Sequence, residues 1–514
     1  MEAGIDKTTS GSLGAVLAQS WPASLTMLSG TLMRFVDGLM AARVGPGPMT
    51  AQQIAGMISF IPEAFAIGAL TVVNTYVSQN LGARRLHACA QYAWAGIAIG
   101  LMVAACMAPL ALLAPSLFAL FPTRGASFVA MQVLYFRYMV LGAFVTLPGR
   151  TLDNFFYGIH RPRVVLGAAL TANAFNVAAN YVLIYGKLGF PALGLEGAAI
   201  GSVLGFGLQL VILLSVYLGP GVHRRFATRR FTGIRWAHLA DILGIGWPSG
   251  VQFCNRVLAW SVFLTVLVGT FGPAHLAATA ISLRYLGLSF MPAVGVGIAT
   301  TALVGKLIGQ DRRDRARRAA RSGLAAAMIY MGTCGVVFWL FRTEMVRFFL
   351  VLPGPAAGGG GAGGELSAEI VRIGSTILIL AAVFQLFDAV SIVYVGALRG
   401  AGDTRWPMVA TIVLSWGLTV GGGVAMVRWM PHWGSLGPWV AASVYTCALG
   451  VALAWRFESG AWEKIDLLRR PRGEPVGAAE ATPTVPELIV GQTPQERPAQ
   501  PQDDPPPPGR SGQL

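Results

Sequence analysis

The segment from Phe384 to Pro407, FQLFDAVSIVYVGALRGAGDTRWP, places a single carboxylate, Asp388, inside an apolar run and ends in a polar cluster. Comparable runs recur along the chain to Phe457, and about 20 such residues are enough to cross the hydrocarbon core as a helix. The sequence of 514 residues is 54% hydrophobic and only 12% charged, whereas soluble domains have roughly 25% charged residues. The chain is therefore predicted to be an all-α polytopic membrane protein.

Twelve apolar runs are long enough to be transmembrane helices. We predict them over residues 13–43, 54–81, 91–121, 128–158, 163–186, 196–218, 239–271, 276–308, 317–350, 367–399, 405–429 and 436–457. Arginines concentrate in alternate connections, at 82–85, 160–163, 223–235, 311–318 and 399–405. Because positively charged loops stay in the cytoplasm and the number of helices is even, both termini are predicted to be cytoplasmic. We expect a multi-pass protein of the bacterial inner (plasma) membrane.

The two halves of the chain resemble each other. Trp21-Pro22 in the first run is matched by Trp247-Pro248 in the seventh, and Phe60-Ile61-Pro62 in the second by Phe290-Met291-Pro292 in the eighth. A repeat with an even number of helices gives two halves of the same orientation, related by an axis along the membrane normal. This predicts two parallel, pseudo-symmetric six-helix lobes that move about a site near the middle of the membrane.

The repeat sets the predicted domain boundaries. Residues 13–218 form an N-lobe and residues 239–457 a C-lobe, and a basic cytoplasmic loop, 219–238, joins them. Residues 1–12 are expected to be a cytoplasmic N-terminus. Residues 458–514 are rich in Pro, Gly and Gln, and because this composition cannot bury a core, we predict a disordered cytoplasmic tail.

Four carboxylates lie inside the predicted helices, at Asp37, Glu63, Asp153 and Asp388. A charged side chain at mid-membrane costs at least about 2.5 kcal/mol, so each of them is a candidate functional residue. Asp153 lies near the cytoplasmic end of its helix, three residues after Arg150. An ion pair between these two side chains explains Asp153 without any role in function.

The first lobe contains a polar stripe. Asn173, Asn176 and Asn180 fall on one face of the fifth helix, and Asp37, one turn after Arg34, offers a matching polar surface on the first helix. We predict that these side chains line a cavity in which Asp37 is functional. The alternatives are that Arg34 and Asp37 form a structural pair and that the amides only bond neighbouring helices.

A second polar cluster is predicted in the second lobe. Gln385 lies one turn before Asp388 in the tenth helix, and further candidates lie on the seventh and eighth helices: Gln252, Asn255, Arg256 and Arg284. Aromatic side chains such as Tyr285 can attract flat organic cations by cation-π interaction. We also expect Glu63 and Arg284 to pair across the cleft when its outer side is shut.

Several motifs together resemble those of one known family. They are GALRGAGDTRWP (396–407), the Phe-Val-Asp of residues 35–37, LGARR (81–85), IGQDRR (308–313) and NVAANYVLIYG (176–186) followed by LGLEGAA (193–199). In combination they are similar to the motifs of the multidrug and toxic compound extrusion (MATE) antiporters, over about residues 13–457. The resemblance implies a two-lobed exporter that moves small organic, often cationic compounds outward in exchange for protons or sodium ions.

The resemblance also implies roles for particular residues. In this family the acid of the first-helix motif belongs to the cation-coupling site of the first lobe, which assigns Asp37 together with Asn176 and Asn180. The acid of the tenth helix belongs to the second-lobe site, which assigns Asp388. The chain departs from the family pattern at Arg256, where many members have a glutamate, and at Asn180, where some have an aspartate. A fixed positive charge beside a carboxylate repels a metal ion and favours the charged acid, so a proton, or no ion at all, is expected at Asp388 in place of sodium. Arg256 is expected to pair with Asp388, and for the whole transporter proton coupling is favoured over sodium.

Other classes of protein fit the sequence less well. The net charge of +15 comes from short arginine clusters between apolar runs, which membrane orientation explains better than nucleic acid binding. The five cysteines lie singly, so the sequence indicates neither a disulfide framework nor a zinc site. We expect a monomer that needs no cofactor besides its coupling ion.

The sequence can be compared with two alternative functions. A membrane-embedded enzyme would need a metal or nucleophile motif, and the sequence contains no HExxH and no paired Asp-rich motif. A lipid-linked oligosaccharide flippase of the same superfamily would need a basic cavity to hold a diphosphate, for which Arg34, Arg256 and Arg284 are available.

Overall fold

The structure, a computed structural model, describes residues 11–120, 125–230, 235–351 and 361–468, and within these ranges the chain is helical without any strand. In helices the backbone groups bond mainly within the same segment, as a bilayer requires. The elements are α2 (Leu13–Val44), α3 (Pro46–Leu70), α4 (Val72–Gly82), α5 (Leu86–Ala119), α6 (Ala126–Gly158), α7 (Pro162–Tyr185), α8 (Leu195–Leu218), α9 (Pro220–Phe226), α10 (Trp236–Val262), α11 (Pro273–Gly309), α12 (Arg313–Leu340), α13 (Arg342–Val351), α14 (Gly361–Ala401), α15 (Arg405–Leu414), α16 (Gly422–Trp429), α17 (Leu436–Glu458) and the 3-10 turn η7 (Ala461–Lys464).

The number of membrane-spanning helices agrees with the sequence. Ten segments of the described chain are long and apolar enough to cross a membrane. α2 and α7 are two further long helices that pack against each other, and polar residues, such as Asp37 and the asparagines of α7, interrupt their apolar sequences. Together they give the twelve-helix, all-α fold that was predicted.

Three of the spans contain irregular turns that the sequence did not predict. Thr71 separates α3 from α4, and its Oγ1 donates to the carbonyl of Gly68 at 2.6 Å. The seventh span continues from α10 into a π-helical segment, Phe263–Val268, and a second such segment, Ser415–Gly421, joins α15 to α16. Single π-helical turns are frequent at functional sites.

Two predicted boundaries are wrong. The ninth helix, expected over 317–350, ends at Leu340, and α13 follows as a separate helix. The break falls where Phe341 is followed by the charged Arg342, whose side chain donates to a main-chain carbonyl of the preceding turn. The inter-lobe connection expected over 219–238 is not simply a loop, because it contains α9 and the beginning of α10.

The start of the C-terminal tail is ordered, contrary to the prediction for residues 458–514. The 3-10 turn η7 buries Trp462, which is only 1% exposed and stacks on Phe457 with 5.2 Å between ring centroids. The prediction rested on the composition of the whole tail, which is poor in apolar residues. The single tryptophan at its start buries enough apolar surface to hold this turn against α17. Residues 469–514 lie outside the described part of the chain.

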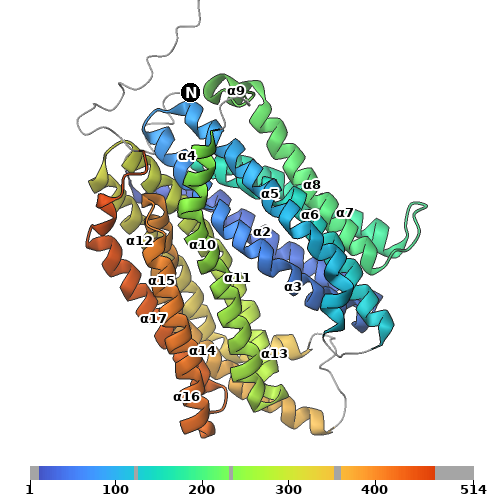
Figure 1. The fold of residues 1–514 in the computed structure, drawn as a ribbon. Coiled ribbons are helices and arrows are strands. Elements are labelled where there is room, and N and C mark those ends of the chain that lie inside the picture. The colour runs from blue at the N-terminus through green and yellow to red at the C-terminus, as the bar shows by residue number, and fades with distance from the viewer. Residues whose placement is uncertain (1–10, 121–124, 231–234, 352–360, 469–514) are drawn as a thin grey trace, which may run out of the picture.

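The helices form two groups that meet at one end of the molecule. α5 to α8 pack mainly within the first group, and α12 to α17 pack mainly within the second. The groups are joined by α4 against α11 and by two further contacts, α2 against α11 and α3 against α10. In the repeat the first span corresponds to the seventh and the second to the eighth, so these two contacts are reciprocal, as a two-fold relation requires. The ribbons of the two groups converge near the N-terminus and diverge toward the opposite end (Figure 1). We call the convergent end, which carries the connections with Arg84, Arg161 and Arg312, the arginine-rich end.

Candidate functional site

Asp37 on α2 begins a chain of hydrogen bonds through the first lobe. Asn180 Nδ2 of α7 donates to Asp37 Oδ1 at 2.7 Å and to Asn176 Oδ1 at 2.8 Å. Asn176 Nδ2 in turn donates to the carbonyl of Gly201 on α8 at 3.1 Å. Asn176 and Asn180 share one helix face because they are four residues apart. Asn176 and Asn180, two of the three asparagines of the predicted stripe, therefore lie together with Asp37.

The groups around Asp37 differ in exposure and in hydrogen bonding. The residue is partly exposed, whereas Asn176 and Asn180 are buried. Asn180 Oδ1 is buried and accepts no hydrogen bond from the residues that the structure describes. A Cβ added to Gly201 would collide with this oxygen, so a glycine is needed for α8 to approach. The site presents a carboxylate with one oxygen bonded and, beside it, a buried amide oxygen without a hydrogen-bond donor among the described residues.

Arg34 and Asn173 lie outside this chain of hydrogen bonds. Arg34 is exposed, and it donates to Thr31 Oγ1 at 3.2 Å without an ion pair to Asp37 among the described residues. Asn173 Nδ2 donates to Ser29 Oγ at 3.3 Å. The alternative of a structural Arg34–Asp37 pair is therefore not realised in this structure.

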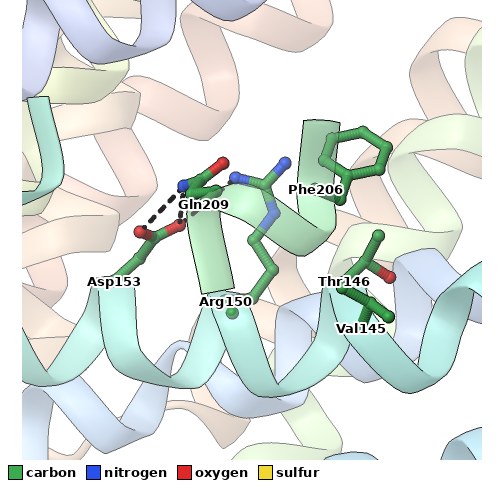
Figure 2. Close-up of a pocket in the computed structure, with 7 residues that line it drawn as sticks. Val145, Thr146, Arg150, Asp153, Phe206 and Gln209 are labelled. Atoms are coloured by element: carbon green, nitrogen blue, oxygen red, sulfur yellow. Dashed lines mark hydrogen bonds and ion pairs between the residues drawn. The ribbon is translucent and has the colours of Figure 1, made fainter. Parts of the chain in front are cut away.

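Asp153 forms the structural contacts that its spacing predicted. Arg150 NH1 lies 3.4 Å from Asp153 Oδ2, and Gln209 Nε2 of α8 donates to both carboxylate oxygens, at 3.1 and 3.4 Å (Figure 2). These three side chains line a small pocket between α6 and α8 together with Val145, Thr146, Gly149 and Phe206. Asp153 is thus satisfied within its own lobe.

Glu63 and Arg284 are not paired in this structure, in which the two groups diverge at the end opposite to the arginine-rich end (Figure 1). The pair was predicted for the state with the outer side shut, and for that state it stays a prediction. Glu63 Oε1 accepts a hydrogen bond from Thr146 Oγ1 at 2.7 Å, within the first lobe. The guanidinium of Arg284 lies 5.5 Å from the ring centroid of Phe349 on α13. The sequence did not show that α13 turns back toward α11 and offers Arg284 an aromatic ring.

Most polar candidates of the second lobe bond separate neighbouring helices instead of one another. Gln385 Nε2 donates to Ser289 Oγ at 2.9 Å, Gln252 Nε2 donates to Thr411 Oγ1 at 2.9 Å, and Tyr285 donates to the carbonyl of Met345 at 2.8 Å. Asn255 donates to Ser415 Oγ at 3.0 Å and accepts from Trp416 Nε1 at 2.8 Å. Asn255 therefore bonds the first turn of the second π-helical segment.

The expected ion pair between Arg256 and Asp388 is absent from the described structure. Arg256 lies 5.8 Å from the ring centroid of Phe290 and acts on Asp388 only by longer-range electrostatics. Within the described residues Asp388 makes neither a hydrogen bond nor an ion pair. The expectation of a direct pair is therefore wrong for this structure, because the guanidinium of Arg256 lies over the ring of Phe290 on α11.

The sequence interpretation missed the polar face of α4. Asn74, Thr75, Ser78 and Gln79 are all buried, although they lie in the second half of an otherwise apolar span. Their spacing of one, four and five residues puts them on one side of a helix. That spacing is the signal that could have identified them from the sequence.

Comparison with known proteins shows the family. The MatE family model matches residues 22–182 and 248–423, more than half of the chain. The probable multidrug resistance protein NorM of Synechococcus sp. is 27% identical over 453 residues, which cover 87% of this chain and 93% of the relative. The multidrug resistance protein NorM of Burkholderia vietnamiensis is 27% identical over 442 residues, which cover 85% and 91%.

Solved structures have the same fold. A multidrug resistance MATE family transporter of the MOP superfamily, in an outward-facing conformation, superposes with a TM-score of 0.78 at 19% identity, over 89% of this chain and 98% of the other. A MOP superfamily transporter from Pyrococcus furiosus has the same score, identity and coverage. Because the family consists of transporters, the alternative of a membrane-embedded enzyme is excluded. The chain belongs to the MatE family and is a multi-pass transporter of the multidrug and toxic compound extrusion type.

Proposed function

We propose that this transporter exports small organic compounds, cationic or amphipathic in character, by alternating access in exchange for protons. The names of its relatives, multidrug resistance proteins, support small-molecule substrates. The observation that carries the proposal is the hydrogen-bonded chain from Asp37 through Asn180 to Asn176. It holds a partly exposed carboxylate inside the first lobe with only one of its oxygens bonded.

The groups around the two carboxylates support a proton over sodium. Hard metal cations bind through several oxygen ligands, whereas Asp37 Oδ1 accepts a hydrogen bond from the Asn180 amide group, which would repel a metal ion. Near Asp388, Arg256 adds a positive charge at longer range. A proton needs only the carboxylate itself.

Protonation of Asp37 would act on the helices that join the lobes. A protonated carboxyl can donate a hydrogen bond, so the contact with Asn180 changes and the relative stability of the lobe arrangements shifts. α2, which carries Asp37, packs on α11 of the other group, where Ser24 Oγ donates to the carbonyl of Pro292 at 2.7 Å. A change at Asp37 is thus transmitted along one helix to the lobe interface.

Transport in inverted membrane vesicles tests this function. We expect uptake of a fluorescent organic cation when a proton gradient, acidic inside, is imposed alone, and no uptake with a sodium gradient alone. Asp37→Asn provides the control, because it keeps the size of the side chain and removes its titration. Uptake that follows sodium and is insensitive to the proton gradient would contradict the proposed coupling.

A flippase for lipid-linked oligosaccharides is the second candidate. Arg34 is exposed on α2, so the first lobe presents a guanidinium group that could contact a diphosphate. Proteoliposomes with a fluorescent lipid diphosphate distinguish the two functions. Movement of this lipid between leaflets, abolished by Arg34→Ala and accompanied by no cation transport, would favour the flippase.

A further inference from the structure

The lobes are joined at the arginine-rich end by side chains of α4 that bond main-chain atoms of the other lobe. Gln79 Nε2 donates to the carbonyl of Gly400 at 2.8 Å, and Thr75 Oγ1 donates to the carbonyl of Arg399 at 2.9 Å. Both acceptors belong to the last turn of α14. α4 therefore bonds the end of a helix in the opposite half of the repeat.

Two further contacts of the same kind flank these bonds. Asn74 Nδ2 lies 3.4 Å from the carbonyl of Ile298 on α11. The hydroxyl group of Tyr76 donates to the carbonyl of Asp241 on α10 at 3.0 Å. Side chains of α4 thus reach the three helices α10, α11 and α14, and every one of these bonds crosses between the lobes.

The hydrogen bond from Gln79 satisfies a main-chain carbonyl at the C-terminal end of α14. The last four carbonyls of a helix have no intrahelical partner, and within the described residues Gly400 O accepts only from Gln79. Nearly all of α4 is buried, so breaking this bond leaves an amide and a carbonyl without partners unless water enters. Gln79 acts as the C-terminal cap of α14, supplied by the other lobe.

The backbones approach closely around this cap. A Cβ on Gly309 would collide with the carbonyl of Gln79, and a Cβ on Gly305 would collide with Ser78 Oγ. Small residues at such positions let membrane helices pack at short range. α4 is therefore seated against α11 and cannot be displaced without separating the lobes.

We propose that α4 is the gate of the arginine-rich end, and that Thr75 and Gln79 are positioning residues that hold it shut by capping α14. This inference rests on the proposed alternating access, because the end must open once in each cycle. α14 also carries Asp388, and α4 continues α3, which carries Glu63. Movements of either helix are therefore transmitted directly to the cap.

The distance between two spin labels measures the state of this gate without any transport assay. Arg84 and Arg312 are exposed at the arginine-rich end, one on each half, and each is replaced by a labelled cysteine. The native cysteines are first replaced by serine: Cys89, Cys106, Cys254, Cys334 and Cys447. Double electron–electron resonance in nanodiscs then gives the populations with the end closed and open.

Two neighbouring amides give a matched pair of variants. Gln79→Ala removes the bond to Gly400, and we expect the population with the longer distance to rise about five- to tenfold. Asn80→Ala removes an amide that donates at 2.8 Å to Tyr76 of its own helix, and the populations should stay as in the parent. Equal shifts in both variants, or no shift in Gln79→Ala, would overturn the proposal.

A second pair covers the case in which Gln79→Ala does not fold. Thr75→Val keeps the shape of the side chain and removes the bond to Arg399. The matched control is Thr151→Val, which removes a bond to the carbonyl of Leu147 within α6 of the first lobe. Only Thr75→Val should open the gate, and an equal response of both would contradict the inference. The two proposals can fail separately. If the spin labels report opening but neither the parent protein nor any variant transports a cation, the proposed export function is wrong and the gate at α4 is still supported.

Discussion

At the scale of single residues, Asp37 and Asp388 have different surroundings although both are carboxylates in apolar helices. Asp37 is bonded to Asn180 of a second helix, whereas Asp388 has no direct partner among the described residues. A polar group in a membrane is usually bonded to a neighbouring helix. The two carboxylates therefore differ in their direct contacts within the described residues.

We expect Asp37→Asn to reduce export to less than a tenth of the parent rate while the protein still folds. The amide keeps the shape of the carboxylate but cannot take up a proton. Asp153→Asn is the matched control, because Asp153 is bonded to Arg150 and Gln209 within its own lobe, and it should keep at least half of the activity. Proton-driven efflux and the melting temperature of each variant are measured. Normal export by Asp37→Asn would remove this residue from the mechanism.

For Arg256 and Asp388 we predict nearly additive effects. The two side chains share no hydrogen bond or ion pair in the described structure, and Arg256 lies over Phe290. In a double-mutant cycle with Arg256→Ala and Asp388→Asn, the coupling energy should stay below about 1 kcal/mol. Thermal unfolding in detergent provides the measurement. A double variant that is several kcal/mol more stable than Arg256→Ala alone would show a buried pair instead.

At the scale of elements, the turn after α17 contributes to stability. Trp462 is buried on Phe457, and its Nε1 donates to the carbonyl of that residue at 2.8 Å. We expect Trp462→Ala to lower the free energy of unfolding by about 3–5 kcal/mol, the usual cost of emptying an aromatic site. Trp455→Ala is the control, because Trp455 is 65% exposed. Melting temperatures that fall equally in both variants would contradict this role.

At the same scale, the interrupted helices explain why predicted boundaries differ from observed ones. The α3 to α4 break at Thr71 and the π-helical segment Ser415–Gly421 lie inside continuous apolar runs. Hydropathy reports only whether a run is apolar, and a local change of hydrogen-bond pattern leaves it unaltered. The end of α12 at Leu340 was also missed, because the apolar character resumes after a few polar residues.

At the scale of the whole molecule, the alternating arginines predict one orientation in the membrane. Leu188, between α7 and α8, is 85% exposed at the end opposite to Arg312. In a background without native cysteines, an impermeant thiol reagent added to intact cells should label Leu188→Cys and not Arg312→Cys. Inverted vesicles should give the reverse result, which controls for reactivity. Labelling of Arg312→Cys in intact cells would mean that the arginine-rich end faces outward.

The sequence by itself determined the class of the protein and much of its architecture. Long apolar runs can only be satisfied as helices in a bilayer, and the matching Trp-Pro and Phe-x-Pro motifs showed the repeat. The asparagine stripe of α7 was also readable, because helical spacing alone places Asn176 beside Asn180. The contact of Asn180 with Asp37 agrees with that interpretation.

Only the tertiary structure decided which polar side chains meet across helices. Arg256 and Arg284 each lie over an aromatic ring. Which neighbouring side chain each arginine contacts depends on how the packed helices are rotated and shifted along their axes. The bond from Gln79 to Gly400 joins residues far apart in the chain, and its acceptor is a main-chain atom that any residue type would supply. Sequence patterns carry no information about such acceptors, because the packing of the lobes alone brings a helix end within reach of an amide.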